Sequence, residues 1–271
     1  MVALNKIKHT TLNIINTRKH WAEQRSYLGG SQIGHSCSRY LWYSFRWCFR
    51  EHLSNRIHRL FNRGHAEEDI FIENLRYAGV TCYGFQEEIT FAYGHGKGHL
   101  DGLALNVREA HKAVHLLEFK TMSDKYFKEV KKVGVKKSKP IYYDQCQIYM
   151  SKLSNVERTL FCAVNKNDDE YYFERLKLDK DHAKLIEDKA KSIVLSETPP
   201  PRIKDDPTWF QCKFCAAADI CHHGEKINET CRTCAHMGIE KDGWWSCGLH
   251  GIYLSTEQQK LMCSEYQQQE L

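Results

Sequence analysis

The stretch at 115–121, HLLEFKT, alternates every second residue as a β-strand does. The apolar Leu117 and Phe119 share one face, and the opposite face carries Glu118 and Lys120. The apolar neighbours predict that this strand is buried, and burying opposite charges without further partners costs free energy. A site that uses both charges would justify that cost. The sequence therefore predicts that Glu118 binds a metal ion and that Lys120 lies beside the substrate or a water molecule.

A second carboxylate for this site lies upstream, in GHLDG at 98–102. The glycines that flank Asp101 leave room for another backbone or a ligand. Asp101 and Glu118 lie on consecutive predicted strands, so we expect them to converge at one edge of a sheet. Mg²⁺ usually binds through one or two carboxylates together with water and phosphate. Its charge would lower the pKa of a bound water and of Lys120.

The order of the other elements predicts an α/β core with a mixed sheet, followed by a cysteine-rich module. The predicted elements are a mostly helical, aromatic-rich segment at 1–60, helices at 56–78, 140–154 and 181–196, strands at 87–94, 98–106, 113–121, 158–166 and 170–178, and a lysine-rich loop or helix end at 125–139. The segment ETPPPRIKDDP at 197–207 is the clearest linker in the chain.

The composition is that of an ordinary soluble protein. The chain has 271 residues, 42% hydrophobic and 27% charged, which is enough for one large domain with an appended module. The net charge of +5 permits a polyanionic partner without requiring one. No apolar run approaches the roughly 20 residues that cross a bilayer, and the first residues lack a signal-peptide pattern. We therefore expect a cytoplasmic protein with no membrane partner.

Asp101 followed by Glu118-x-Lys120 resembles the signature of the PD-(D/E)XK nuclease superfamily. Two further motifs, with GHLDG itself, resemble its RecB-like and lambda-exonuclease-like branch and occur in that branch's order: RGHAEED at 63–69 and QCQIY at 145–149. The resemblance covers roughly residues 30–222. It implies a restriction-endonuclease-like core at 1–222, with a central mixed sheet flanked by helices, and leaves 223–271 as a small tail.

The resemblance also implies roles for individual residues. The implied ligands of Mg²⁺ or Mn²⁺ are Glu68, Asp101 and Glu118, with His65 as a further candidate and Glu67 as an alternative to Glu68. Lys120 would position the attacking water. Gln145 and Tyr149 lie one helical turn apart, and they would align the DNA backbone or Lys120 itself.

Three cysteines in CKFCAAADIC at 212–221 have a ligand-like spacing and need a fourth partner. Iron–sulfur nucleases of this branch, among them the CRISPR-adaptation nucleases, hold a [4Fe–4S] cluster by one N-terminal and three C-terminal cysteines. The implied cluster ligands are Cys37, Cys212, Cys215 and Cys221, although Ser38 stands where those families often have proline. Zn²⁺ would suit the same four thiolates. Alternatively, Cys37 is a buried apolar residue and His222 or His223 completes a zinc site.

A second set of cysteines follows in the tail. CRTC at 231–234 has zinc-knuckle spacing. The predicted zinc ligands are Cys231, Cys234, Cys247 and Cys263, with His250 competing for the fourth position. A module of about 40 residues scarcely folds without such a metal. We expect a zinc-ribbon-like tail, similar to those of phage-encoded nucleases, which is either structural or contacts DNA or a partner.

Basic residues suggest where DNA would lie. The run KEVKKVGVKKSK at 128–139 is either a solvated loop or a rim that contacts phosphates. The candidate DNA contacts are Lys128, Lys131, Lys132, Lys136, Lys137, Lys139 and Arg39. The arginines and aromatic residues of SCSRYLWYSFRWCFR at 36–50 either stack on bases or, as we favour, pack in the core.

These features together predict a Mg²⁺- or Mn²⁺-dependent deoxyribonuclease. The resemblance implies an exonuclease acting on single-stranded DNA or resected ends in recombination, repair or phage DNA processing. A recombination or replication protein is a candidate partner, and a phage-encoded protein would act in the host cytoplasm. The alternatives are a restriction-type endonuclease with the same site and a non-catalytic iron–sulfur or zinc DNA-binding subunit. RNA stays open as a substrate.

Overall fold

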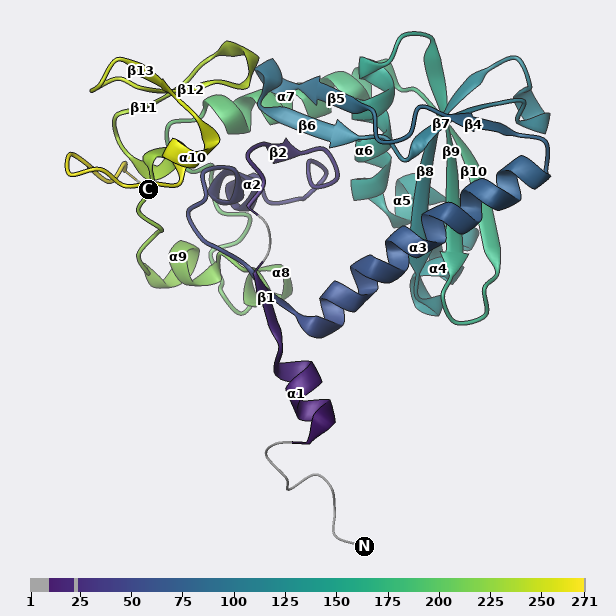
Figure 1. Ribbon diagram of the computed structural model, residues 1–271, viewed down its shortest axis with the longest axis horizontal. Coiled ribbons are helices and arrows are strands. Elements are labelled where there is room, and N and C mark those ends of the chain that lie inside the picture. The colour runs from purple at the N-terminus through teal and green to yellow at the C-terminus, as the bar shows by residue number, and fades with distance from the viewer. Residues whose placement is uncertain (1–9, 22–23, 271) are drawn as a thin grey trace, which may run out of the picture.

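The computed structural model describes residues 10–21 and 24–270, which form an α/β arrangement with mixed sheets (Figure 1). The main sheet has the strand order β10-β9-β8-β7-β4. Its strands are β4 (Thr81–Tyr83), β7 (Gly102–Leu105), β8 (Val114–Met122), β9 (Val156–Asn165) and β10 (Tyr171–Lys177). Strands β8 and β9 are parallel, and the other neighbours are antiparallel. The predicted mixed sheet is confirmed.

Helices flank this sheet on both faces. The helices of the core are α1 (Thr11–Thr17), α2 (Ser38–Phe45), α3 (Asn55–Tyr77), α4 (Asp124–Val133), α5 (Val135–Ser138), α6 (Pro140–Lys152), α7 (Lys180–Leu195), α8 (Phe210–Lys213) and α9 (Ala218–His223), with short 3-10 turns η2 (Ala92–Gly94) and η3 (Arg108–Ala110). Across residues 10–21 and 24–270, no helix is long and apolar enough to cross a membrane.

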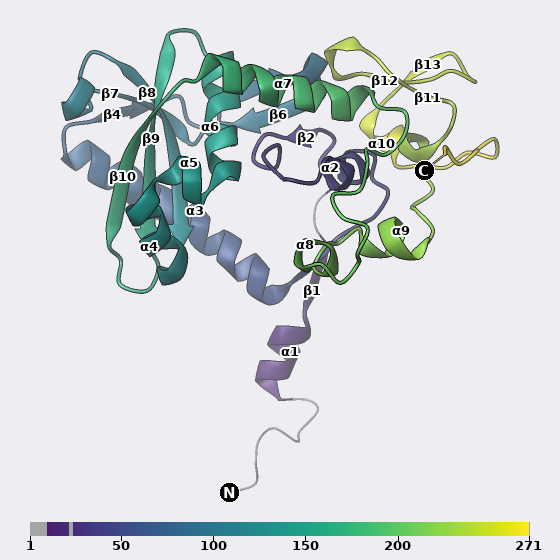
Figure 2. The same cartoon turned by 180° about the vertical axis from the view of Figure 1, so that it is seen from behind.

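The two faces of β8 pack against different helices, as its alternation predicts. Leu117 and Phe119 share an apolar cluster with Phe71 of α3, whose ring stacks on that of Phe119 at a centroid distance of 5.0 Å. Leu116 and Met122 point to the other face, into the cluster that includes α4 and α6. Figures 1 and 2 show α3 crossing one face of the sheet and α4 and α6 on the other. The charged face of β8 is therefore the face toward α6.

The prediction of one continuous strand at 98–106 is wrong. Its first part lies in a second sheet, which comprises β2 (Leu28–Gly29), β6 (Gly96–His99) and β5 (Glu88–Phe91) in that order. Its second part is β7 of the main sheet. Gly102, with a φ of 155°, lets the backbone change direction between the two sheets. This break places Asp101 between the sheets, next to β8.

The remaining elements agree with prediction except near the N-terminus. Helices α3, α6 and α7 and strands β9 and β10 occupy the predicted ranges within a few residues, and 125–139 forms α4 and α5. The predicted strand at 87–94 shortens to β5 and continues as η2, and β4 was not predicted. The described part of 1–60 also contains three short strands, namely β2 and the pair β1 (Lys19–Trp21) and β3 (His52–Ser54). The rest of that prediction, at 1–9 and 22–23, lies outside the described residues.

The aromatic residues of α2 and the following turn lie inside the core. Trp42, Tyr43, Phe45 and Trp47 are each at most 2% exposed. Arg46 is also buried, with its guanidinium 4.6 Å from the centre of the Trp42 ring. Covered rings cannot stack on nucleic acid bases. For these four rings the interpretation that they pack the core is therefore right, and the alternative base-stacking role is wrong.

The residues after 223 form a small module that packs on the core. Its elements are η4 (Cys231–Thr233), β11 (Met237–Ile239), η5 (Lys241–Gly243), β12 (Trp245–Cys247), β13 (Ile252–Leu254) and α10 (Thr256–Gln259), with the three strands in one antiparallel sheet. Trp245 and Leu254 belong to the same apolar cluster as the residues of α2 and α6. The apolar core therefore continues across the predicted boundary at 222–223.

Arg232 joins this module to the core. Its side chain is 0% exposed, and its guanidinium lies 3.8 Å from the centre of the Trp47 ring and 4.2 Å from that of Trp245. It donates hydrogen bonds of 2.6–2.9 Å to the carbonyl oxygens of Phe45 and Ser26 and to Oε1 of Gln259. We call this set of partners the Arg232 socket. It pairs a buried cation with aromatic faces and acceptors, as burial of a charge requires.

Candidate active site

The charged face of β8 has partners on both sides, which explains how it is buried. Glu118 is 1% exposed, and its Oε1 forms a very short ion pair with the ammonium of Lys120. Its Oε2 accepts a hydrogen bond of 2.9 Å from Nε2 of Gln145 on α6. Asp101 Oδ2 accepts a hydrogen bond of 2.7 Å from the backbone N–H of Phe119. The predicted meeting of Asp101 with the Glu118–Lys120 strand is thus observed.

Glu68 approaches this cluster from α3, with His65 beside it. Nδ1 of His65 lies 3.5 Å from Glu68 Oε1. The neighbouring Glu67 is paired instead with Arg63, at 3.6 Å along the same helix. Of the two candidate glutamates, Glu68 is the one whose pKa is raised by burial and by the charge of Asp101.

The negative charges of the carboxylates at this site repel one another, which makes their ionised forms less stable. Burial raises the pKa of Glu118 to about 7, and the charges of Asp101 and Glu68 add to this rise. Burial also raises the pKa of Asp101 and of Glu68. Burial alone would lower the pKa of Lys120, but the Glu118 and Asp101 carboxylates raise it above its ordinary value. The two carboxylates thus raise the pKa of Lys120, whereas a bound metal ion is predicted to lower it.

The donor chemistry fits a hard divalent cation, since three carboxylates that repel one another are the oxygen ligands that Mg²⁺ and Mn²⁺ prefer. Within the described residues, however, no three His, Cys, Asp or Glu side chains are already grouped closely enough to hold a metal ion. At this site Lys120 pairs with one oxygen of Glu118, and the Phe119 N–H donates to one oxygen of Asp101.

A surface cavity of about 450 Å³ opens onto this cluster. Glu68 and Lys120 line it together with Arg25 and Tyr142. The ammonium of Lys120 lies 5.1 Å from the centre of the Tyr142 ring. Sequence reasoning missed both Arg25 and Tyr142. The sequence could have indicated Tyr142, because it precedes Gln145 by three residues and so shares its helix face. Arg25 lies in a segment with no recognisable pattern.

The two residues of the QCQIY motif have different surroundings. Gln145 is buried and contacts Glu118, as expected of a residue that orients the site. Tyr149 is 3% exposed, and its ring fills the space above Gly30 and Gly98, where a Cβ atom would overlap it. The space that Gly98 was predicted to leave for a ligand is therefore occupied by Tyr149. A covered Tyr149 does not align DNA directly, which corrects that part of the prediction.

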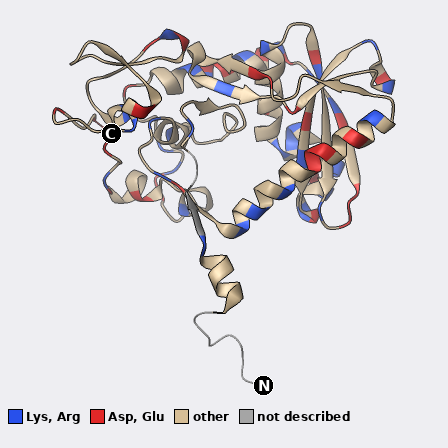
Figure 3. Ribbon diagram, viewed as in Figure 1, with Lys and Arg blue, Asp and Glu red and all other residues tan. Residues whose placement is uncertain are grey.

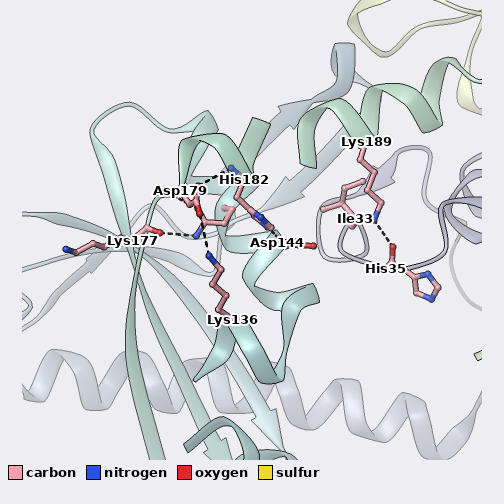
Figure 4. Close-up of polar contacts among 9 residues, drawn as sticks. Ile33, His35, Lys136, Asp144, Lys177, Asp179, His182 and Lys189 are labelled. Atoms are coloured by element: carbon pink, nitrogen blue, oxygen red, sulfur yellow. Dashed lines mark hydrogen bonds and ion pairs between the residues drawn. The ribbon is translucent and has the colours of Figure 1, made fainter. Parts of the chain in front are cut away.

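Polar contacts hold α6 on either side of Gln145 (Figure 4). Asp144 Oδ1 lies 2.6 Å from Nε2 of His182 on α7. Gln147 accepts a hydrogen bond of 2.7 Å from the Asp179 N–H through its Oε1. Lys189 of α7 donates to the carbonyl oxygens of 33 and 35, at 2.7 Å each, in the loop that leads to Cys37. These contacts fix the position of α6, which carries Gln145, relative to the loop that leads to Cys37.

The first cysteine set surrounds a small cavity of about 30 Å³ near the N-terminus of α2. Its four predicted ligands, Cys37, Cys212, Cys215 and Cys221, all line this cavity. Burial raises the pKa of the Cys215 thiol, and the other three thiols raise it further. His222 lines the cavity too, so the zinc alternative keeps a candidate ligand there. The chain thus brings residue 37 beside residues that follow it by about 180 positions.

The second cysteine set lines a cavity of about 210 Å³ in the tail module. Its four predicted ligands, Cys231, Cys234, Cys247 and Cys263, are joined there by His250 and by His236. Burial raises the pKa of the Cys231 thiol, and the three other cysteines raise it further. Sequence reasoning missed His236, although it follows the CRTC motif by two residues. His250 and His236 thus line the same cavity as the four cysteines, as further candidate donors.

Most of the predicted DNA contacts have partners within the protein. Three of the lysines are paired with carboxylates: Lys128 with Asp124 at 2.8 Å, Lys131 with Glu170, and Lys136 with Asp179 at 3.5 Å. Lys139 lies over the Tyr126 ring, and Lys132 and Lys137 lie on α4 and α5. Arg39 donates to the carbonyl oxygens of Pro199 and Pro200. None of these seven residues lines the 450 Å³ cavity, and Arg39 anchors the linker.

Comparison with known proteins gives structural similarity only. No protein-family model and no curated protein matches the chain. The chain resembles LHK-Exo in complex with dAMP at a TM-score of 0.44, with 14% identity over 63% of this chain and 87% of that one. The chain also resembles the alkaline exonuclease (LHK-Exo) from Laribacter hongkongensis at a TM-score of 0.43, with 16% identity over 62% of this chain and 86% of that one. Its resemblance to SSO0001 has a TM-score of 0.41, with 16% identity over 74% of this chain and 87% of that one. At these values the similarity assigns neither a family nor an activity, so the function is argued from the site.

Proposed function

We propose that this chain is a metal-dependent deoxyribonuclease that hydrolyses phosphodiester bonds at DNA ends. The observation that carries the proposal is the convergence of Asp101, from the break between β6 and β7, with Glu118 and Lys120 of β8, while Glu68 approaches from α3, beside one surface cavity. Burying carboxylates that repel one another around a lysine costs free energy on folding. The same carboxylates can bind a cation next to a phosphate, which would explain why they are grouped. A role in recombination, repair or phage DNA processing, with a partner protein of that process, follows only from the sequence resemblance.

The protein's own groups suggest how a phosphodiester would be handled. A bound Mg²⁺ or Mn²⁺, held by Asp101, Glu118 and Glu68, would lower the pKa of a water and offset charge developing on the phosphate. Burial lowers the pKa of Lys120, but the Glu118 and Asp101 carboxylates raise it above its ordinary value. A protonated Lys120 is suited to hold the water or a phosphate oxygen by donating hydrogen bonds. Gln145 keeps the Glu118 carboxylate oriented toward this point.

End-labelled linear single-stranded DNA, linear duplex and circular single-stranded DNA test this proposal. We expect Mg²⁺ or Mn²⁺ to support stepwise shortening of linear DNA, and EDTA to abolish it, because the carboxylates need a cation to act on phosphate. Cleavage of the circles would favour the endonuclease alternative, and preferential cleavage of a matched RNA would change the substrate class. If DNA is bound but not hydrolysed with any metal, the chain is a binding subunit and the nuclease proposal fails.

We also propose that the two cysteine sets hold different metals. A [4Fe–4S] cluster at Cys37, Cys212, Cys215 and Cys221 is supported by the four cysteines that line one small cavity. Zn²⁺ in the tail is supported by the CRTC spacing and by the nearby histidine donors. Each group would tie distant segments together and so stabilise the fold.

Metal content under anaerobic purification separates these assignments. We expect a brown protein with about four iron atoms and about one zinc atom per chain. Cys37→Ser should lose the iron and keep the zinc, whereas Cys247→Ser should do the reverse, so each variant serves as the control for the other. A colourless wild-type protein that holds only zinc would overturn the iron–sulfur assignment.

A further inference from the structure

We propose that a groove beside the catalytic cavity holds a single DNA strand leading to the cut, with Phe61 as the residue on which a base stacks. The inference depends on the proposed nuclease function and adds to it the path of the substrate. It also gives the cysteine-rich module a role, because that module forms one end of the groove.

The groove lies beside the catalytic cavity. The groove has a volume of about 810 Å³ and lies between the N-terminal half of α3, the segment 24–27 and the tail module. Three residues, Arg25, Phe61 and His65, line both it and the cavity that contains Lys120. A chain molecule bound in the groove therefore lies next to the cavity that Glu68 and Lys120 line.

Phe61 occupies the junction between the two spaces and is 53% exposed. It precedes His65 by four residues and Glu68 by seven, so the three lie on one face of α3. Tyr27, Tyr40 and Phe49 also line the groove. Unpaired bases stack on aromatic faces, whereas the bases of a duplex are already stacked on one another. The aromatic lining therefore selects a single strand over a duplex.

The charges around the groove favour a polyanion. Arg25 and Lys260 line the groove, and among the described residues that line it the only carboxylate is Glu51. Figure 3 shows basic positions along the N-terminal half of α3 and acidic ones at its middle, near the catalytic cavity. The exposed Arg56 and Arg59 belong to this basic half but do not line the groove. Phosphates in the groove would thus lie near Arg25 and Lys260 and meet the acidic cluster only at the cut.

The tail module supplies the end of the groove away from the site. Thr256 of α10 and the following Lys260 line it. Helix α10 is held in place because Gln259 accepts two hydrogen bonds from Arg232 in its socket. The module therefore presents Lys260 at a fixed position relative to Phe61, as a site for a phosphate distant from the cut would need.

Binding of fluorescent oligonucleotides, measured by anisotropy in the hydrolysis-defective Lys120→Ala background with Mg²⁺, tests the groove. We expect Phe61→Ala to weaken binding of single-stranded DNA about tenfold, as loss of one stacked base does, and Phe61→Trp to retain it. Lys260→Glu should weaken binding severalfold and reduce its dependence on salt. Tyr77→Ala is the matched control, because Tyr77 lies at the far end of the same helix and is 94% exposed.

The outcomes separate this inference from the function on which it depends. Unchanged single-strand affinity in Phe61→Ala, or equal weakening for a blunt duplex, would overturn the groove even if the wild-type chain hydrolyses DNA. A wild-type chain that hydrolyses nothing, yet loses single-strand binding with Phe61→Ala, would overturn the nuclease and retain the groove. A matched RNA strand bound more tightly than the DNA strand would overturn the assignment of DNA as the occupant.

Discussion

Lys120→Ala is expected to lower the rate of DNA hydrolysis by about 10²- to 10⁴-fold, the range for loss of a group that acts directly on the reacting atoms. The ammonium of Lys120 is the cation closest to the buried Glu118 carboxylate and lies in the wall of the catalytic cavity. Its removal takes away the donor that positions water or phosphate. It also leaves Glu118 beside Asp101 without a counter-charge, which further raises the pKa of Glu118. The measurement is kcat/KM on end-labelled linear DNA.

Lys152→Ala is the matched control for this change. Lys152 is also partly buried and forms an ion pair of 2.9 Å with Glu187, but it lies at the end of α6 outside the catalytic cavity. We expect this variant to keep the wild-type rate. Thermal unfolding of both variants shows whether each is folded. A folded Lys120→Ala chain that cleaves as fast as wild type would mean that the pair with Glu118 serves only structure.

Arg232→Ala is expected to lower the free energy of unfolding more than any of the other substitutions proposed for this chain. The side chain is 0% exposed and donates to acceptors from three separate segments, so its removal leaves those acceptors unpaired and opens a cavity between Trp47 and Trp245. An unpaired buried acceptor costs about 1–3 kcal/mol. We therefore expect the free energy of unfolding to fall by at least about 3 kcal/mol, which at 2–4 °C per kcal/mol corresponds to a Tm lower by roughly 6–12 °C.

Arg175→Ala provides the comparison. Arg175 is exposed on β10 and donates one hydrogen bond of 3.2 Å to the carbonyl oxygen of Glu109. Its removal should change stability by no more than about 0.5 kcal/mol, as is usual for surface positions. Both variants are to be melted at the same zinc and iron content, because bound metal itself raises Tm. Equal melting temperatures for Arg232→Ala and wild type would show that the socket does not hold the module to the core.

The parts of the site that could be predicted are those specified by local pattern. The alternation of Leu117 and Phe119 with Glu118 and Lys120 correctly predicts a strand with one apolar and one charged face. The helical spacing around Gln145 likewise predicts that it points toward that strand, as its hydrogen bond to Glu118 shows. In each case neighbouring residues in the chain determine the geometry, so a short stretch of sequence is sufficient.

The failures have a common physical origin in packing between distant segments. Tyr149 has the spacing of a substrate contact, yet two glycines from other segments, Gly30 and Gly98, accept its ring and bury it. Arg39 has the charge of a DNA contact, but the linker carbonyls at 199 and 200 lie within its reach. No spacing rule indicates which distant backbone will approach a side chain.

The sequence by itself predicted most of the helices and strands, the charged face of β8 and two sets of cysteines with metal-ligand spacing, and the family resemblance implied that Cys37 joins the cysteines of 212–221. Only the tertiary structure decided that Asp101 lies between two sheets and that Arg232 enters an aromatic socket. Local periodicity is a property of neighbouring residues and can be read along the chain. Contacts between distant segments depend instead on how whole elements pack, and the close packing of the core selects one arrangement among many.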